Sequence, residues 1–146
     1  MLDKLFKGFR REEEIEEDEL TLPRATAALL VEAARADEEY TDKERDLIAK
    51  RLAAKFSLTP DQARTLRIEA ETDQAEANDL YTFSSVVKDG LDHQGRIALI
   101  EDMWRVVLTD DERDPFEEQV IRRLVGLLHL EDRESQLARQ RVEAAS

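Results

Sequence analysis

The stretch ALLVEAARADEEYTDKERDLI, residues 28–48, contains an apolar segment, an acidic turn and a second segment that is apolar on one side. Apolar residues on both sides of the turn recur at intervals of three and four, the spacing of one face of an α-helix. Thr41 and Glu44 have the spacing of a capping box, in which each side chain accepts a hydrogen bond from the other residue's backbone N–H. The stretch therefore predicts a helix, a short turn and a capped second helix.

The same pattern occurs again 73 residues later, in LIEDMWRVVLTDDERDPFEEQVIRRL, residues 99–124. The apolar positions, the turn length, an Asp after the first helix and a Glu at the start of the second all coincide. The matched pairs are Leu30 and Met103, Ala33 and Val106, Ala34 and Val107, Asp37 and Asp110, Glu39 and Glu112, Glu44 and Glu117, Leu47 and Val120, and Ile48 and Ile121. A shared helical period alone does not align a turn and a cap, so we infer a duplicated helix–turn–helix unit.

The rest of the chain predicts helices joined by short connections, over about residues 24–35, 42–56, 60–76, 80–88, 93–107, 115–128 and 133–143. An aromatic content of 5%, four Gly and three Pro leave little material for strands and β-turns. Abundant Ala, Leu, Glu and Arg favour helix. We therefore expect an all-α fold, a compact bundle of about seven to eight helices that contains two pseudo-repeated helical hairpins.

The composition is strongly acidic, with 35 Asp and Glu against 22 Lys and Arg and a formal net charge of −13. This charge repels nucleic-acid phosphates, so the expected partners are cations and basic protein segments. The absence of Cys excludes disulfides, thiolate metal sites and a Cys nucleophile, and two distant His argue against a His-based zinc or catalytic site. The sequence contains no Gly-rich phosphate loop or nucleophile motif, and we expect no enzymatic activity.

Residues 1–22 are expected to lie outside the folded domain of residues 23–146. Residues 1–11 (MLDKLFKGFRR, Met1 to Arg11) form a basic amphipathic segment, which predicts docking on the domain or a partner, or weak association with a membrane surface. Residues 11–20 (REEEIEEDEL) predict an acidic linker or frayed helix. No run approaches the ~20 apolar residues needed to span a bilayer, and the start lacks the apolar core of a secretory signal. We therefore expect a cytoplasmic location.

Four acidic residues of the repeat lie at the ends of the apolar helix faces that are expected to face the core. Asp37 and Asp110 follow the first helix of each copy, and Glu44 and Glu117 lie at the start of the second. The helix dipole disfavours a carboxylate at a helix C-terminus by about 0.3–1 kcal/mol, so each Asp needs a compensating charge or donor. A divalent cation such as Ca²⁺, Mg²⁺ or Mn²⁺ would supply the charge, since these ions prefer oxygen ligands. The N-terminus of the next helix would also compensate each Asp, and the capping box alone accounts for each Glu. The sequence leaves both interpretations open.

An EF-hand interpretation of the two acidic turns fails. With Asp37 or Asp110 at position 1 of the loop, position 12 falls on Ile48 or Ile121. An EF-hand requires a bidentate Glu at that position. The turns therefore do not predict a calcium loop of that type.

Residues 28–48 and 99–124 resemble the two motifs of TerB-like proteins, the tellurite-resistance TerB superfamily. Residues 79–87 (DLYTFSSVV) and 122–139 (RRLVGLLHLEDRESQLAR) are similar to its uncharacterised bacterial branch, and the resemblance covers about residues 25–141. It implies an all-α fold of two pseudo-symmetric halves, a link to tellurite or general stress responses, and no catalytic activity. It also implies a role in divalent-metal binding for Asp37, Glu44, Asp110 and Glu117.

The sequence departs from the family pattern once in each turn, where Glu38 and Asp111 replace the usual Gly. Gly permits a left-handed backbone after the helix, whereas Asp tolerates it moderately and Glu poorly.

The sequence as a whole supports two functional hypotheses. One is a non-catalytic module that binds a divalent cation, and the other is a metal-free interaction module whose acidic surface docks a basic protein.

Overall fold

The computed structural model describes residues 20–36, 39–109 and 115–145. This part of the chain contains no strand and seven helices: α2 (Leu22–Ala34), α3 (Asp42–Phe56), α4 (Pro60–Glu76), α5 (Tyr81–Gly90), α6 (His93–Val107), α7 (Pro115–Leu127) and α8 (Asp132–Ala145). The all-α prediction is confirmed, and each predicted helix is present within two residues of its expected bounds. Among the described residues, no helix is long and apolar enough to cross a membrane.

Capping side chains determine where α2 and α3 begin. Helix α2 begins earlier than predicted because Thr21 is its N-cap, and the Oγ1 atom of Thr21 accepts a hydrogen bond from the backbone N–H of Arg24 at 3.3 Å. Pro23 lies in the first turn, where its missing N–H costs no helical hydrogen bond. The predicted capping box of α3 is confirmed: Thr41 N donates to Glu44 Oε1 at 2.9 Å, and Glu44 N donates to Thr41 Oγ1 at 3.1 Å.

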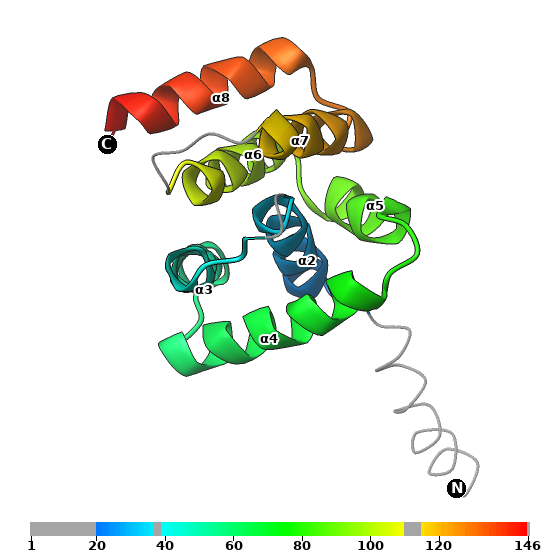
Figure 1. Ribbon diagram of the computed structural model, residues 1–146. Helices are drawn as coiled ribbons and strands as arrows, with labels where there is room; N and C mark the ends of the chain where they lie inside the picture. Colours follow the sequence, from blue (N-terminus) through cyan, green and yellow to red (C-terminus); the bar gives the residue numbers. More distant parts are fainter. Residues whose placement is uncertain (1–19, 37–38, 110–114, 146) are drawn as a thin grey trace, which may run out of the picture.

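Helix α2 is the centre of the molecule and packs against α3, α4, α5, α6 and α7. In Figure 1, α4 crosses α2 and α3 on one side, and α8 lies over α6 and α7 on the opposite side. Nine of the 13 residues of α2 are buried, and five of these are Ala. Such small side chains let the neighbouring helices approach closely. Other large and fully buried side chains include Ile48, Leu52, Leu99, Ile100, Met103 and Ile121.

The predicted repeat is present and extends to three helices, α2–α3–α4 and α6–α7–α8, with α5 between the two units. Helix α2 packs on both α3 and α7, and α6 packs on both α7 and α3, so the units interlock. Matched apolar positions are buried alike: Leu30 and Met103 have no exposed surface, and neither have Ile48 and Ile121. The two copies therefore share one core instead of forming two separate ones.

The two units also end and restart their helices alike. Ser57 after α3 and His129 after α7 both adopt the left-handed conformation, with φ of 58° and 59°. At the start of the third helix of each unit, the N-cap N–H donates to the N3 side chain at 2.9 Å, Gln62 Oε1 in one and Glu134 Oε1 in the other. These equivalent residues are 72 positions apart instead of 73. The second copy is therefore one residue shorter between its second and third helices.

Leu29→Ala is expected to lower the free energy of unfolding by about 2–5 kcal/mol, because it leaves a cavity at a fully buried position of α2. Ile68→Ala on α4 is the matched control, since Ile68 is 50% exposed and its truncation should change stability by less than about 0.5 kcal/mol. Urea unfolding followed by helical circular dichroism measures both. A similar effect of the two substitutions would contradict the central position of α2.

Candidate functional site

The predicted cation ligands are Asp37, Glu44, Asp110 and Glu117. Asp37 and Asp110 lie outside the described residues, as does the residue that follows each of them in place of the family Gly. Glu117 lies in α7, and its side chain is also outside the description. Of the four predicted ligands, Glu44 is therefore the one whose side-chain burial and contacts the structure describes. Among the residues that the structure describes, no group of three or more His, Cys, Asp or Glu is arranged to hold a metal ion.

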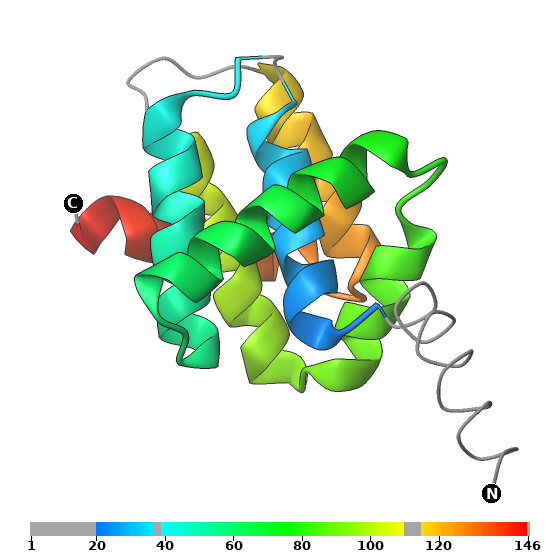
Figure 2. The same cartoon turned by 90° about the horizontal axis from the view of Figure 1, so that it is seen from below.

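The helix ends that flank the two acidic turns gather in one region. Figure 2 shows the C-termini of α2 and α6 and the N-termini of α3 and α7 at the same end of the molecule. The positive ends of the α3 and α7 dipoles and the negative ends of the α2 and α6 dipoles therefore lie near one another. The fold brings together the flanks of two turns that are 73 residues apart in the sequence, as a site shared between the turns requires.

Glu44 lies in this region on the first turn of α3 and is only 1% exposed. A buried carboxylate needs hydrogen bonds or an opposite charge to offset the loss of water. The capping box supplies such a bond to Oε1. Glu44 therefore has a structural role, and its carboxylate is at the same time the type of oxygen ligand that hard divalent cations prefer.

The first acidic turn is held to α4 on both of its sides. Before the turn, Arg35 Nη1 donates to Gln74 Oε1 at 2.7 Å and to the Glu71 carbonyl oxygen at 3.3 Å. After the turn, the Tyr40 hydroxyl donates to Glu71 Oε2 at 2.6 Å. Arg67 Nη1 donates to the same oxygen at 2.7 Å, so the carboxylate is charge-paired. One helix thus fixes both ends of the turn.

Tyr40 is a residue of this region that the sequence analysis did not identify. Two guanidinium groups lie over its ring, Arg45 at 4.4 Å and Arg35 at 5.0 Å from the centroid. Burial and the hydrogen bond to Glu71 raise the pKa of Tyr40 above the ordinary tyrosine value. Its hydroxyl partner is 31 residues away on α4. No local periodicity in the sequence indicates such a contact.

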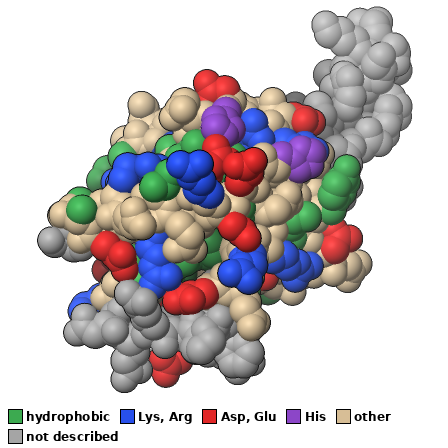
Figure 3. Space-filling view, turned by 90° about the horizontal axis from the view of Figure 1, so that it is seen from above, with side chains coloured by type: hydrophobic (Ala, Val, Ile, Leu, Met, Phe, Trp, Pro, Cys, Tyr) green, Lys and Arg blue, Asp and Glu red, His purple; other side chains and the backbone are tan. Residues whose placement is uncertain are grey.

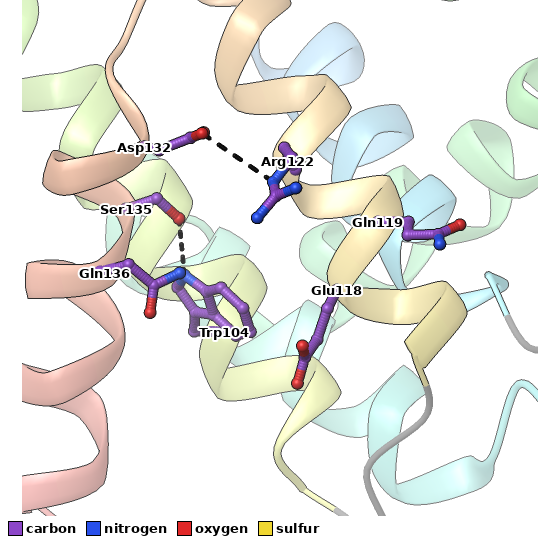
Figure 4. Close-up of a pocket in the computed structure, with 7 residues that line it drawn as sticks. All are labelled: Trp104, Glu118, Gln119, Arg122, Asp132, Ser135 and Gln136. Atoms are coloured by element: carbon purple, nitrogen blue, oxygen red, sulfur yellow. Dashed lines mark hydrogen bonds and ion pairs between the residues drawn. The ribbon is translucent and has the colours of Figure 1, made fainter.

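A separate cavity of about 220 Å³ lies between α6, α7 and α8 (Figure 4). The Trp104 indole N–H donates to Ser135 Oγ at 3.1 Å on its wall, while Arg122 Nε lies 3.9 Å from Asp132 Oδ2 at its edge. Trp104 is 2% exposed. Pockets that hold small-molecule ligands usually have volumes of about 300–1,000 Å³, so this cavity is too small to indicate one. Its lining residues are Trp104, Glu118, Gln119, Arg122, Asp132, Ser135 and Gln136.

The face seen from the α8 side carries charges of both signs. In Figure 3, Lys and Arg side chains are interspersed with Asp and Glu side chains on this face. Arg141 Nε lies 2.7 Å from Glu101 Oε2, and His93 Nε2 lies 2.6 Å from Glu134 Oε2. This face is therefore not a single-sign acidic surface of the kind that would attract a basic partner.

The described helices and the shared region of their turns define an all-α domain built from two interlocked three-helix units. The model of the family described as tellurite resistance protein TerB matches residues 23–140, most of the chain. The chain therefore belongs to the TerB family. No curated protein and no solved structure matches it.

Tyr40→Phe is expected to lower the free energy of unfolding by about 1–3 kcal/mol at neutral pH, because it removes a part-buried hydrogen bond to the charged Glu71. A raised pKa means that folded Tyr40 holds its proton more tightly than unfolded Tyr40. The resulting stability is complete below the unfolded tyrosine pKa of about 10 and is lost as the pH rises above it. Urea unfolding should therefore show a steeper loss above about pH 10 for wild type than for Tyr40→Phe. Parallel pH dependences would contradict this assignment.

Proposed function

We propose that the chain is a non-catalytic TerB-family domain that binds a divalent cation, Ca²⁺, Mg²⁺ or Mn²⁺, between its two acidic turns. The ligands would be the carboxylates of Asp37, Glu44, Asp110 and Glu117. The observation that supports this proposal most is the gathering of the flanking helix ends of both turns at one end of the molecule (Figure 2).

The chemistry of the four residues supports a hard cation. Carboxylate oxygens suit Ca²⁺, Mg²⁺ and Mn²⁺, and the chain has no Cys that would favour a softer metal. A cation would also offset the unfavourable position of Asp37 and Asp110 after helix C-termini. The contacts of Arg35 and Tyr40 to α4 hold the first turn, which lowers the ordering cost of binding there.

The family name is the support for a role in tellurite resistance or a wider stress response. A non-catalytic role is supported by the composition, which has no Cys and only two His. In this proposal cation binding changes the conformation or the surface of the acidic end, and a protein partner responds to that change.

The alternative proposal is a metal-free interaction module. It is favoured by the capping box of Glu44, which gives this residue a sufficient structural reason to be present. The net charge of −13 would then attract a basic partner. Residues 1–11, which lie outside the described part of the chain, would attach the domain to that partner or weakly to a membrane surface.

Calorimetric titration with Ca²⁺ and Mn²⁺ tests the cation proposal. We expect saturable binding to the wild type and a loss of at least about tenfold in affinity for Asp37→Asn/Asp110→Asn, equivalent to about 1.4 kcal/mol. The matched control is Asp61→Asn/Asp89→Asn, which removes the same charge at two exposed positions outside the acidic turns. Its affinity should equal that of the wild type. Negligible binding to the wild type, or equal losses in the two double variants, would favour the metal-free module.

Glu44→Gln separates the capping role from ligation. Gln serves as the N3 partner in the box of Thr59 and Gln62, so the substitution should keep the α3 cap and change stability by less than about 1 kcal/mol. The cation affinity should still fall about tenfold, because a neutral amide replaces a charged ligand. Urea unfolding and calorimetry measure the two effects. A large loss of stability with unchanged affinity would assign Glu44 a structural role alone.

A further inference from the structure

The two interlocked units leave one helix–helix seam covered and its counterpart uncovered. Helix α5 packs on α2 and α7 and covers the seam between them. The equivalent seam by the repeat lies between α3 and α6, which also pack on each other. In Figure 1, α5 lies beside α2 and α7, and no other described helix takes the corresponding position beside α3 and α6. The α3/α6 seam thus lies at the surface, whereas the α2/α7 seam is covered by α5.

Apolar side chains of the covered seam's helices correspond to charged side chains at the uncovered seam. Leu29 on α2, Leu124 on α7 and Leu128 directly after α7 are all fully buried. The 73-residue relation matches these three leucines with Asp102, Arg51 and Lys55, in that order. Three apolar residues in one copy are therefore charged in the other.

Asp102 is the centre of the charged seam and is 1% exposed. Its Oδ1 atom lies 2.8 Å from Arg51 Nε and 2.7 Å from Arg105 Nη1. Its Oδ2 atom lies 3.3 Å from Lys55 Nζ. Three cations surround a single buried carboxylate, and Arg51 and Arg105 are each about one third exposed. They remain accessible from solvent.

The seam carries an excess of positive charge on an acidic protein. Glu101 adds a second carboxylate, 3.6 Å from Arg105 and 2.7 Å from Arg141. Among the described residues named above, four cations against two carboxylates give a charge of +2, while the chain as a whole carries −13. Arg51 and Arg141 form these ion pairs through Nε and are about one third and one half exposed, so solvent reaches both side chains. An acidic segment is the complement of this surface.

We infer that the α3/α6 seam docks an acidic segment and that this segment is the chain's own run of residues 12–19. The run lies outside the described residues and contains seven Asp and Glu and no Lys or Arg. A free acidic partner would be repelled by the net charge of −13, whereas a tethered segment has an effective concentration of about 1 mM or more. Weak, individually exposed ion pairs are then sufficient for substantial occupancy.

The run is also within reach of the seam. Pro23, at the start of α2, and Leu58, just after α3, line one shallow groove of about 450 Å³. Lys55 is in the last turn of α3, three residues before Leu58. The side chain of Leu22 meets Gly90 of α5, so the described chain begins between α5 and this groove, across the groove from the Lys55 end of the seam. Eight extended residues span up to about 27 Å, enough to cross this groove and reach Lys55 and Arg51.

A spin label in the run tests this inference. The chain has no native Cys, so Ile15→Cys carries a single nitroxide in the middle of the run. In a buffer with a chelator, we expect broadening of the backbone amide signals of α3 and α6 around Arg51, Lys55 and Arg105. The broadening should fall roughly fivefold between about 0.01 M and about 1 M salt, because the screening length shortens from about 30 Å to about 3 Å. No selective broadening at the seam at low salt would overturn the inference.

Two variants make the test specific without disturbing Asp102. Replacing the seven acids of the run by Gln and Asn should abolish the broadening and leave the other amide signals in place. Arg141→Gln changes a half-exposed residue that does not touch Asp102, and should reduce the broadening by about twofold. Unchanged broadening in the neutralised run would overturn the inference. Broadening of an isotope-labelled chain by a separate spin-labelled one, with none inside a chain, would overturn it too.

Discussion

The burial of α2 by five other helices is the constraint on which the rest of the structure depends. Its alanines allow close approach on several sides at once, so α3, α4, α5, α6 and α7 are all positioned against one element. The end of α2 determines where the first acidic turn begins. Since α6 packs on α2 and on α7, the second turn begins in the same region. The candidate site is thus a consequence of core packing.

The helices and the duplicated hairpin were predictable because their signals are local. Thr41 with Glu44, and the recurring apolar positions, act within a few residues, and the structure contains the predicted helices and this cap. The third helix of each unit was not recognised as part of the repeat. Its equivalent residues, such as Gln62 and Glu134, are 72 positions apart, so a comparison at a fixed shift of 73 misses them.

The contacts that sequence analysis missed join residues far apart in the chain. Tyr40 and Glu71 are 31 residues apart, and Arg51 and Asp102 are 51 residues apart. Whether such side chains meet depends on which faces of two helices pack together. Hydrophobic periodicity shows which face of a helix is apolar but not which other helix packs on it. For the same reason the position of the four predicted ligands at the ends of apolar helix faces was predictable, while their arrangement relative to one another was not. Of the four, Glu44 has a described side chain, and it serves the cap.

The unequal seams give the domain a preferred place to open. The α2/α7 contact excludes water with leucines beneath α5, so its separation exposes apolar surface. The α3/α6 contact depends on Asp102 and its cations, and a buried ion pair contributes little net free energy after desolvation. Water can also reach its cations directly. Amide hydrogen exchange should therefore report local opening first along α3. This makes α3 more labile than α7, its counterpart in the second unit.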